Sequence, residues 1–151
     1  MFEGIGLQTI LGTAATIGIG ATTPADCYVG LAARTPSNTF DIADPAGTLG
    51  CQYDWNTTRF FAEHISSPSK SNDWPGINHA GVKQLFARND SFAAYVGISA
   101  AIPSKQLTST PVLSQIGAEL GEDMIKFYGE YIFSVSKPED GMLVGGLKFI
   151  F

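Results

Sequence analysis

Apolar and polar residues alternate along most of this chain at the two-residue period of a β-strand. In KFYGEYIFSV, residues 126–135, one face contains Phe127 and Phe133 and is mainly apolar, while the opposite face contains Lys126 and Glu130. Similar alternation predicts seven strands, in CYVGLAAR, LGCQYDW, RFFAEHIS, AGVKQLFA, FAAYVGISAAI, KFYGEYIFSV and the last segment of the chain. The pattern therefore favours an all-β fold.

Two further segments complete the predicted elements. Near the N-terminus, GLQTILG and TIGIGA suit a hairpin of two glycine-rich strands, which brings the expected number of strands to eight or nine. The segment PVLSQIGAELG, residues 111–121, is the one candidate helix, because it begins with proline and ends with glycine. The sequence contains no repeat, low-complexity tract or linker, so we expect one domain over residues 1–151.

The C-terminal segment GMLVGGLKFIF narrows the fold class. Leu143, Leu147, Phe149 and Phe151 share one face, and Lys148 lies on the other. This segment resembles the closing strand of bacterial outer-membrane β-barrels, which end in an aromatic residue preceded by alternating apolar residues, and the chain length matches the small eight-stranded members. The resemblance implies an antiparallel up-and-down β-barrel of about eight strands. A soluble β-sandwich, whose last strand packs one face on a core, would show the same alternation and is the alternative.

The charge composition argues against nucleic acids as partners. The chain has 151 residues and a net charge of −5, and its nine Lys and Arg residues are scattered singly. A nucleic-acid-binding protein would instead present clustered positive charge. We therefore expect no nucleic-acid partner.

The first charge-free segment, residues 4–25, bears on localisation. A signal peptide begins with a basic region, but the only early charge is Glu3 and the first basic residue is Arg34. As a transmembrane helix, the segment contains too many glycine and threonine residues. We therefore expect no ordinary secretion, unless the protein was produced without its leader.

The candidate catalytic residues lie at the end of the predicted strand RFFAEHIS. His64 and Ser66 share one face of the predicted strand, and Glu63 lies on the other. The His-x-Ser pair at a strand end resembles the outer-membrane lipid A deacylases, eight-stranded barrels with a His, a Ser two residues later and a Glu on the next strand. The resemblance implies Ser66 as nucleophile and His64 as general base, with a carboxylate such as Glu63 to orient the imidazole. The chain departs from that family because residues 78–89 contain no acid.

The non-catalytic interpretation of the same stretch is a polar rim followed by an interaction loop. Loop residues expected to contact a partner are Asn72, Asp73, Trp74 and Asn78. The sequence shows neither a His/Cys cluster nor a nucleotide-binding glycine motif, so we expect no metal and no cofactor.

Cys27 and Cys51 are the only cysteines. If their two strands form a hairpin that closes near Asn38 and Thr39, the cysteines face each other and a cross-strand disulfide is possible. The alternative is two buried thiols, which the missing export signal favours.

Three functions follow as hypotheses. The first is a non-enzymatic structural or interaction protein, a bacteriophage virion or ejection component located in the virion and contacting other subunits, as a homo- or hetero-oligomer, or the host outer membrane. Tailed phages encode small barrels of this type, and a virion component needs no signal peptide. The second is an outer-membrane esterase of the lipid A deacylase type, acting on lipid A acyl chains through Ser66 and His64. The third is a non-catalytic outer-membrane barrel that blocks or shields surface receptors, with outer-membrane lipid or lipopolysaccharide as a partner.

Overall fold

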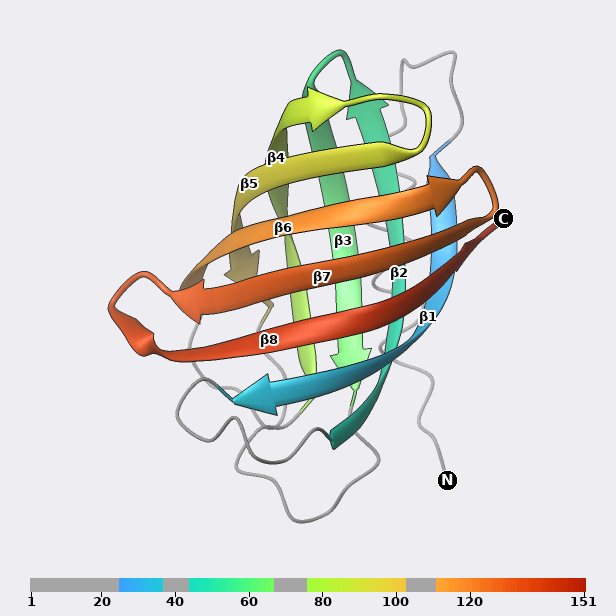
Figure 1. Cartoon of the computed structure of the whole chain (residues 1–151). Helices are drawn as coiled ribbons and strands as arrows, with labels where there is room; N and C mark the ends of the chain where they lie inside the picture. Colours follow the sequence, from blue (N-terminus) through green and yellow to red (C-terminus); the bar gives the residue numbers. More distant parts are fainter. Residues whose placement is uncertain (1–24, 37–43, 67–75, 103–110) are drawn as a thin grey trace.

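The computed structural model describes residues 25–36, 44–66, 76–102 and 111–151 of the chain. These residues form eight strands: β1 (Asp26–Pro36), β2 (Asp44–Trp55), β3 (Thr58–Ser66), β4 (Ile77–Arg88), β5 (Phe92–Ala101), β6 (Val112–Glu122), β7 (Ile125–Ser134) and β8 (Lys137–Ile150). Each strand pairs antiparallel with the next, and β8 pairs with β1, so the sheet closes into a barrel (Figure 1). The predicted all-β antiparallel barrel is confirmed. The sandwich alternative is wrong, because a closed sheet has no free edges.

The expected N-terminal hairpin lies outside the described residues. Within the part of the chain that the structure describes, no helix has the length and hydropathy needed to cross a bilayer.

The segment 111–121 was predicted as a helix, and this prediction is wrong: it forms β6. Buried and exposed residues alternate along this strand, with Gln115 and Glu119 buried. On its outer face the large residues Val112, Ile116 and Leu120 alternate with small ones, so large apolar side chains recur every four residues. That spacing imitates one face of a helix.

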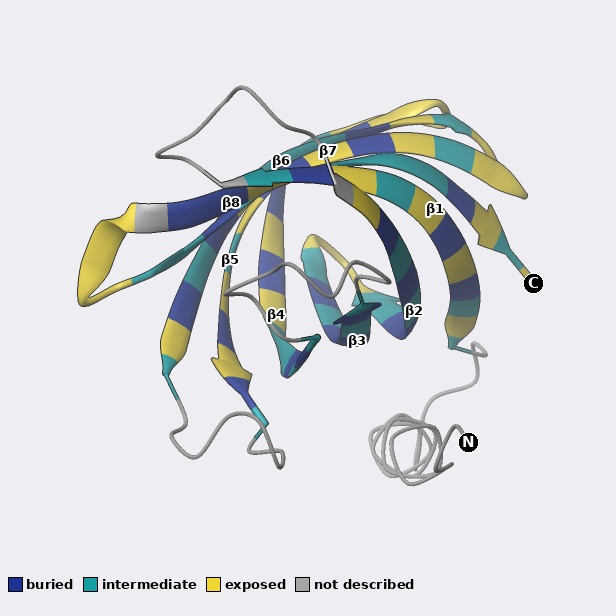
Figure 2. Cartoon of the chain, turned by 90° about the horizontal axis from the view of Figure 1, so that it is seen from below, coloured by how far each residue is buried: buried dark blue, intermediate teal, exposed yellow. Residues whose placement is uncertain are grey.

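The barrel is polar inside and apolar outside. Figure 2 shows buried and exposed residues alternating along the strands, as the two-residue period requires. The exposed alternate positions are mostly large and apolar, for example Phe86 at 64% and Phe127 at 61% exposure. The buried polar and charged side chains are Arg34, Thr48, Gln52, Arg59, Glu63, His79, Lys83, Ser99, Gln115, Glu119, Glu130 and Lys148.

The two ends of the barrel differ. At one end, called the short-turn end, β1 begins, β8 ends, and short turns join consecutive strands at 56–57, 89–91 and 123–124. At the opposite end, called the long-loop end, the connections run through 37–43, 67–76, 102–111 and the short turn 135–136. Asn56 has a positive φ of 55° in its turn, a conformation that asparagine tolerates well.

Side chains fill the barrel interior. Toward the long-loop end, a buried apolar layer includes Ile65, Ile77, Leu113, Ile132 and Met142. Toward the short-turn end, two interior tyrosines each lie across from a glycine on the neighbouring strand: Tyr28 faces Gly50, and Tyr95 faces Gly117. A Cβ atom at either glycine would come within 2.6–2.8 Å of the tyrosine hydroxyl, so the rings occupy the space that the glycines leave. An eight-stranded barrel of this kind has a packed interior rather than an aqueous channel.

Candidate functional site

A cluster of ionisable side chains, called the interior cluster, occupies the middle of the barrel. Its members are Asp54, Arg59, Glu63, His79, Lys83, Glu119, Glu130 and Lys148. Arg59 Nη1 donates to Glu119 Oε2 at 2.7 Å, and Lys83 Nζ donates to Glu130 Oε2 at 3.1 Å. Lys148 Nζ lies 3.4 Å from Glu119 Oε1 and 3.8 Å from Glu63 Oε2. Each carboxylate in the cluster therefore has a cationic partner, as buried charges require.

Aromatic rings complete the surroundings of the two buried lysines. Lys83 Nζ lies 4.4 Å from the ring centroid of Phe61 and 4.5 Å from that of Tyr95. Lys148 Nζ lies between the rings of Tyr28 and Tyr128, at 4.6 and 4.3 Å. All four distances are within the range of cation–π attraction, which helps to replace the lost hydration of each ammonium group.

Sequence reasoning did not identify the interior cluster. It noted single members, such as Lys148 opposite an apolar face, but assigned no role to them. The available signal was that strands with a large apolar face carry a charged residue on the other face, as with Glu119 and Glu130. In a barrel with apolar side chains outside, that other face is the interior.

Glu63, His79 and Ser99 form a Glu–His–Ser series inside the barrel. His79 Nε2 is 3.4 Å from Glu63 Oε1, a contact that lacks hydrogen-bond geometry. Gln115 Nε2 donates to His79 Nδ1 at 3.0 Å, which makes Nδ1 an acceptor and places the ring proton on Nε2. Ser99 Oγ is 3.1 Å from the same Nδ1. The three residues are between 0 and 4% exposed, so the Ser99 hydroxyl is out of reach of a substrate.

His64 and Ser66 lie on the outer side of the barrel wall, near the long-loop end. Both are half-buried. His64 faces Asn78 of β4 in the ladder, and His64 Nδ1 is 2.7 Å from Asn78 Oδ1. Ser66 Oγ donates a long hydrogen bond of 3.4 Å to the carbonyl oxygen of Gly47. The structure thus brings Asn78 to His64, with Ser66 two residues along the same face.

Glu63 does not join this outer pair, because its side chain points into the barrel. Its Oε2 accepts a hydrogen bond of 2.6 Å from the Tyr28 hydroxyl. A role for Glu63 in orienting His64 is therefore excluded by the barrel wall between them. Of the four residues expected in an interaction loop, Asn72, Asp73 and Trp74 lie outside the described residues, and Asn78 lies on β4.

Cys27 and Cys51 face each other on β1 and β2 and form a disulfide bond. The sequence analysis preferred two reduced thiols, and the structure differs from that preference. The reason is geometric: the register pairs the two residues directly, as their symmetric spacing about the connection allows. A structural disulfide is typical of proteins in oxidising compartments.

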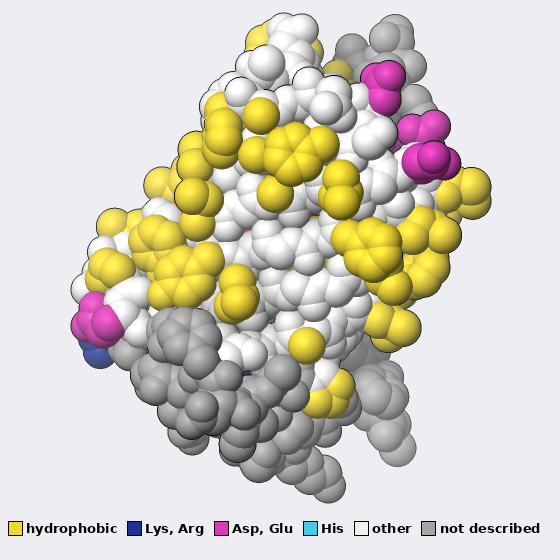
Figure 3. Space-filling model, in the orientation of Figure 1, with side chains coloured by type: hydrophobic (Ala, Val, Ile, Leu, Met, Phe, Trp, Pro, Cys, Tyr) yellow, Lys and Arg dark blue, Asp and Glu magenta, His cyan; other side chains and the backbone are white. Residues whose placement is uncertain are grey.

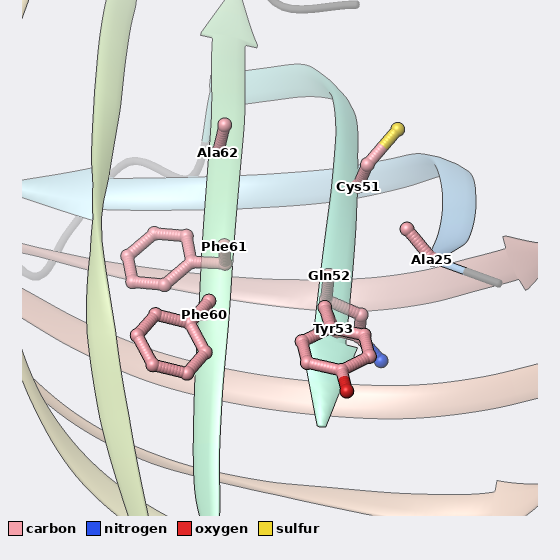
Figure 4. A pocket seen from close by; sticks show the side chains of 7 residues that line it. All are labelled: Ala25, Cys51, Gln52, Tyr53, Phe60, Phe61 and Ala62. Carbon is pink, nitrogen blue, oxygen red and sulfur yellow. The ribbon is translucent and has the colours of Figure 1, made fainter. Parts of the chain in front are cut away.

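Two hollows among the described residues lie away from His64 and Ser66. Figure 4 shows a small pocket lined by Cys51, Gln52 and Tyr53 of β2, by Phe60, Phe61 and Ala62 of β3, and by Ala25. Its cavity volume of about 10 Å³ is close to that of one water molecule. A larger polar hollow of about 710 Å³ opens at the short-turn end, where Arg59, Glu119 and Lys126 contribute to its lining. Among the residues described, no group of three or more His, Cys, Asp or Glu side chains is arranged to hold a metal ion.

Comparisons with known proteins support the fold and leave the family open. No family model and no curated protein matches the chain. The barrel is similar to a solved structure from the de novo design of transmembrane β-barrels, with a TM-score of 0.63 and 11% identity over 86% of this chain and 98% of that chain. It is also similar to Ail, the attachment invasion locus protein of Yersinia pestis, solved in complex with the heparin analogue sucrose octasulfate. That comparison has a TM-score of 0.46 and 13% identity over 84% of this chain and 97% of that chain. The chain therefore has the fold of a closed eight-stranded antiparallel barrel, similar to that of a designed transmembrane barrel.

Proposed function

We propose that this protein is an outer-membrane β-barrel that holds its apolar outer wall in the lipid and presents its long-loop end for interactions. The observation that supports this proposal is the inverted polarity of the barrel, with paired charges inside and large apolar side chains outside. In water, such an outer wall would expose far more continuous apolar surface than monomeric soluble proteins tolerate. In a bilayer the same wall is the expected arrangement.

The exposed charges follow the same pattern. Among the described residues, every exposed charged side chain lies at a strand end or in a turn: Asp26, Arg88, Asp90, Glu122, Asp123, Lys137 and Glu139. On the face shown in Figure 3, apolar side chains gather over the strands, and Asp and Glu appear near the edges. A charge-free band between two charged rims matches the hydrocarbon core between two interfaces.

Aromatic residues flank this band. Exposed Trp55, Phe86 and Phe127 lie near the short-turn end. Tyr131 and Phe133, whose stacked ring centroids are 5.4 Å apart, lie toward the long-loop end of β7. Aromatic girdles of this type occupy both membrane interfaces in outer-membrane barrels.

The packed interior limits what such a barrel does. Because the interior cluster and the apolar layer fill the space within the strands, a single copy has no channel for a solute. Binding at the loops, at the outer wall or in the polar hollow at the short-turn end is the remaining mode of action. This supports the non-catalytic barrel that binds or shields surface components. Neither of the two similar structures is a virion protein, so the virion hypothesis gains no support from them and stays a prediction.

The test is to purify the full chain and compare its folding in plain buffer, in detergent micelles and in lipid vesicles. We expect β-rich circular dichroism and a heat-dependent shift in gel mobility only with detergent or lipid. A stable, monodisperse β protein in plain buffer would exclude the membrane proposal and favour a soluble virion component.

A second candidate function is an esterase at His64 and Ser66. The observation that favours it is the position of both side chains on the lipid-facing side of the wall, near the loops, where the ester bonds of a membrane lipid lie. In this reaction the Ser66 Oγ bonds to the acyl carbon while its proton passes to His64 Nε2, and that proton then goes to the departing alcohol oxygen. Water next gives a proton to His64 Nε2 and attacks the acyl carbon, and Ser66 Oγ leaves with that proton, so that a free fatty acid is released and the Ser66 hydroxyl is regenerated.

This activity is measured as fatty acid released from lipopolysaccharide by the detergent-folded protein. Ser66→Ala should abolish the release. Ser114→Ala, which removes another half-buried outward serine on β6, is the matched control and should leave it unchanged. No release by the folded wild-type protein would exclude the esterase while leaving the membrane proposal standing.

A further inference from the structure

The contact between His64 and Asn78 has a chemical consequence for the second candidate function. His64 Nδ1 and Asn78 Oδ1 are 2.7 Å apart, and the amide oxygen can only accept a hydrogen bond. The ring nitrogen must then be the donor. We infer that Asn78 is a positioning residue that holds the proton of His64 on Nδ1 and leaves Nε2 as an unprotonated base.

The interior of the barrel fixes this contact. The ladder pairs Glu63 with His79 and Ile65 with Ile77 on either side of the His64–Asn78 pair, and all four flanking residues are buried. A shift of β4 by one residue along β3 would move His79 and the other interior side chains of β4 to the apolar outer wall. The packing inside the barrel therefore keeps Asn78 opposite His64 on the outside.

An amide suits this position better than a carboxylate. A charged carboxylate on the lipid-facing wall would lose hydration, which is costly in or near the hydrocarbon region. An amide oxygen makes the same hydrogen bond to Nδ1 without a charge. Residues 78–89 contain no acid. Asn78 is the first residue of that segment, and it takes the place next to His64 that an acid would have.

The two histidines of this chain provide an internal comparison. His79 is held in the opposite tautomer, with its proton on Nε2, because Gln115 donates to its Nδ1. The imidazole ¹⁵N chemical shifts of the two rings should therefore differ in a way that reports the protonated nitrogen directly. Since the chain has two histidines, His64→Gln assigns the signals by removing one set.

The experiment is ¹⁵N NMR of the full chain folded in detergent micelles, for the wild type, Asn78→Leu and Asn78→Asp. We expect a proton on Nδ1 of His64 in the wild type, a mixture of tautomers in Asn78→Leu, and the wild-type tautomer again in Asn78→Asp, which keeps an acceptor oxygen. Gln84→Leu, on the outer face of β4 and away from His64, should leave the His64 signals unchanged. A proton on Nε2 of His64 in the wild type, or an unchanged tautomer in Asn78→Leu, would overturn the inference.

The catalytic role of Asn78 rests on the second candidate function, whereas its effect on the His64 tautomer does not. The esterase and the tautomer assignment are therefore tested by separate experiments. If the esterase is present, Asn78→Leu should lower kcat by roughly 10²-fold with little change in KM, because the base is misoriented while the acyl-binding surface is intact. Asn78→Asp should restore most of the rate. If Ser66-dependent release is absent, the esterase falls, and the NMR result still decides whether Asn78 holds the His64 ring.

Discussion

Glu63 and His64 are consecutive residues whose side chains lie on opposite sides of the barrel wall. The Glu63 carboxylate accepts a hydrogen bond of 2.6 Å from Tyr28 inside, and the His64 imidazole contacts Asn78 at 2.7 Å outside. The alternation of a single strand thus separates two different environments by one residue. Predictions for neighbouring substitutions differ accordingly.

Glu63→Leu should destabilise the barrel strongly, while His64→Leu should not. The first change removes one of the two carboxylates beside Lys148 Nζ and the acceptor of the Tyr28 hydroxyl, and loss of one member of a buried ion pair costs about 3–5 kcal/mol. The second removes one outer hydrogen bond, worth about 0.6 kcal/mol on average in membrane proteins. Urea unfolding in detergent micelles, followed by tryptophan fluorescence, measures both free energies. Equal effects of the two changes would contradict the assignment of Glu63 to the interior.

Lys83 and Glu130 should behave as a coupled pair. Lys83→Met alone leaves the Glu130 carboxylate without its cation, so we expect a loss of about 3–5 kcal/mol in the free energy of unfolding. Adding Glu130→Gln removes that charge and keeps an oxygen that accepts from the Tyr95 hydroxyl. The double variant should therefore be more stable than the Lys83→Met single variant. The double-mutant cycle measures the coupling, and strictly additive effects would argue against a direct pair.

Substitution of an outer-wall residue by arginine tests whether that residue lies in the hydrocarbon region of the bilayer. Ile116 lies in the middle of β6 and is 51% exposed, so Ile116→Arg should cost about 2–4 kcal/mol in lipid vesicles. Met124 lies in the turn between β6 and β7 and is exposed, so Met124→Arg should cost about 1 kcal/mol or less. Reversible unfolding in vesicles provides the comparison. If both substitutions were equally tolerated, Ile116 would lie in water and the membrane proposal would fail.

Much of the fold was predictable from local alternation, and the sites were less so. The apolar face through Phe127 and Phe133 and the C-terminal face through Phe149 were both read correctly from period two. β6 was predicted as a helix because its segment begins with Pro111 and ends with Gly121, and the large residues Val112, Ile116 and Leu120 on its outer face also have a helical spacing.

Local patterns carry less information on contacts between strands. Glu119 and Glu130 were assigned to no environment, because the sequence does not state which face of a strand meets water. The partner of His64 depends on the register between β3 and β4, and the sequence does not give the geometry of the connection that sets it. Asn78 was therefore assigned to a loop, although the structure places it on β4 beside His64.

The disulfide between Cys27 and Cys51 should contribute measurable stability. The bond closes a segment with a sequence separation of 24 residues, and chain-entropy estimates give about 3 kcal/mol for loops of similar length. We expect Cys27→Ser with Cys51→Ser to lower the free energy of unfolding by about that amount and to leave β-rich circular dichroism in detergent unchanged. Reduction of the wild-type protein should reproduce the effect, and it should have no effect on the double serine variant, which serves as the control. Because β1 also pairs with β8, the ladder itself holds the barrel closed without the bond. A double variant that no longer folds at all would show that the disulfide, rather than strand pairing, is needed to close the barrel.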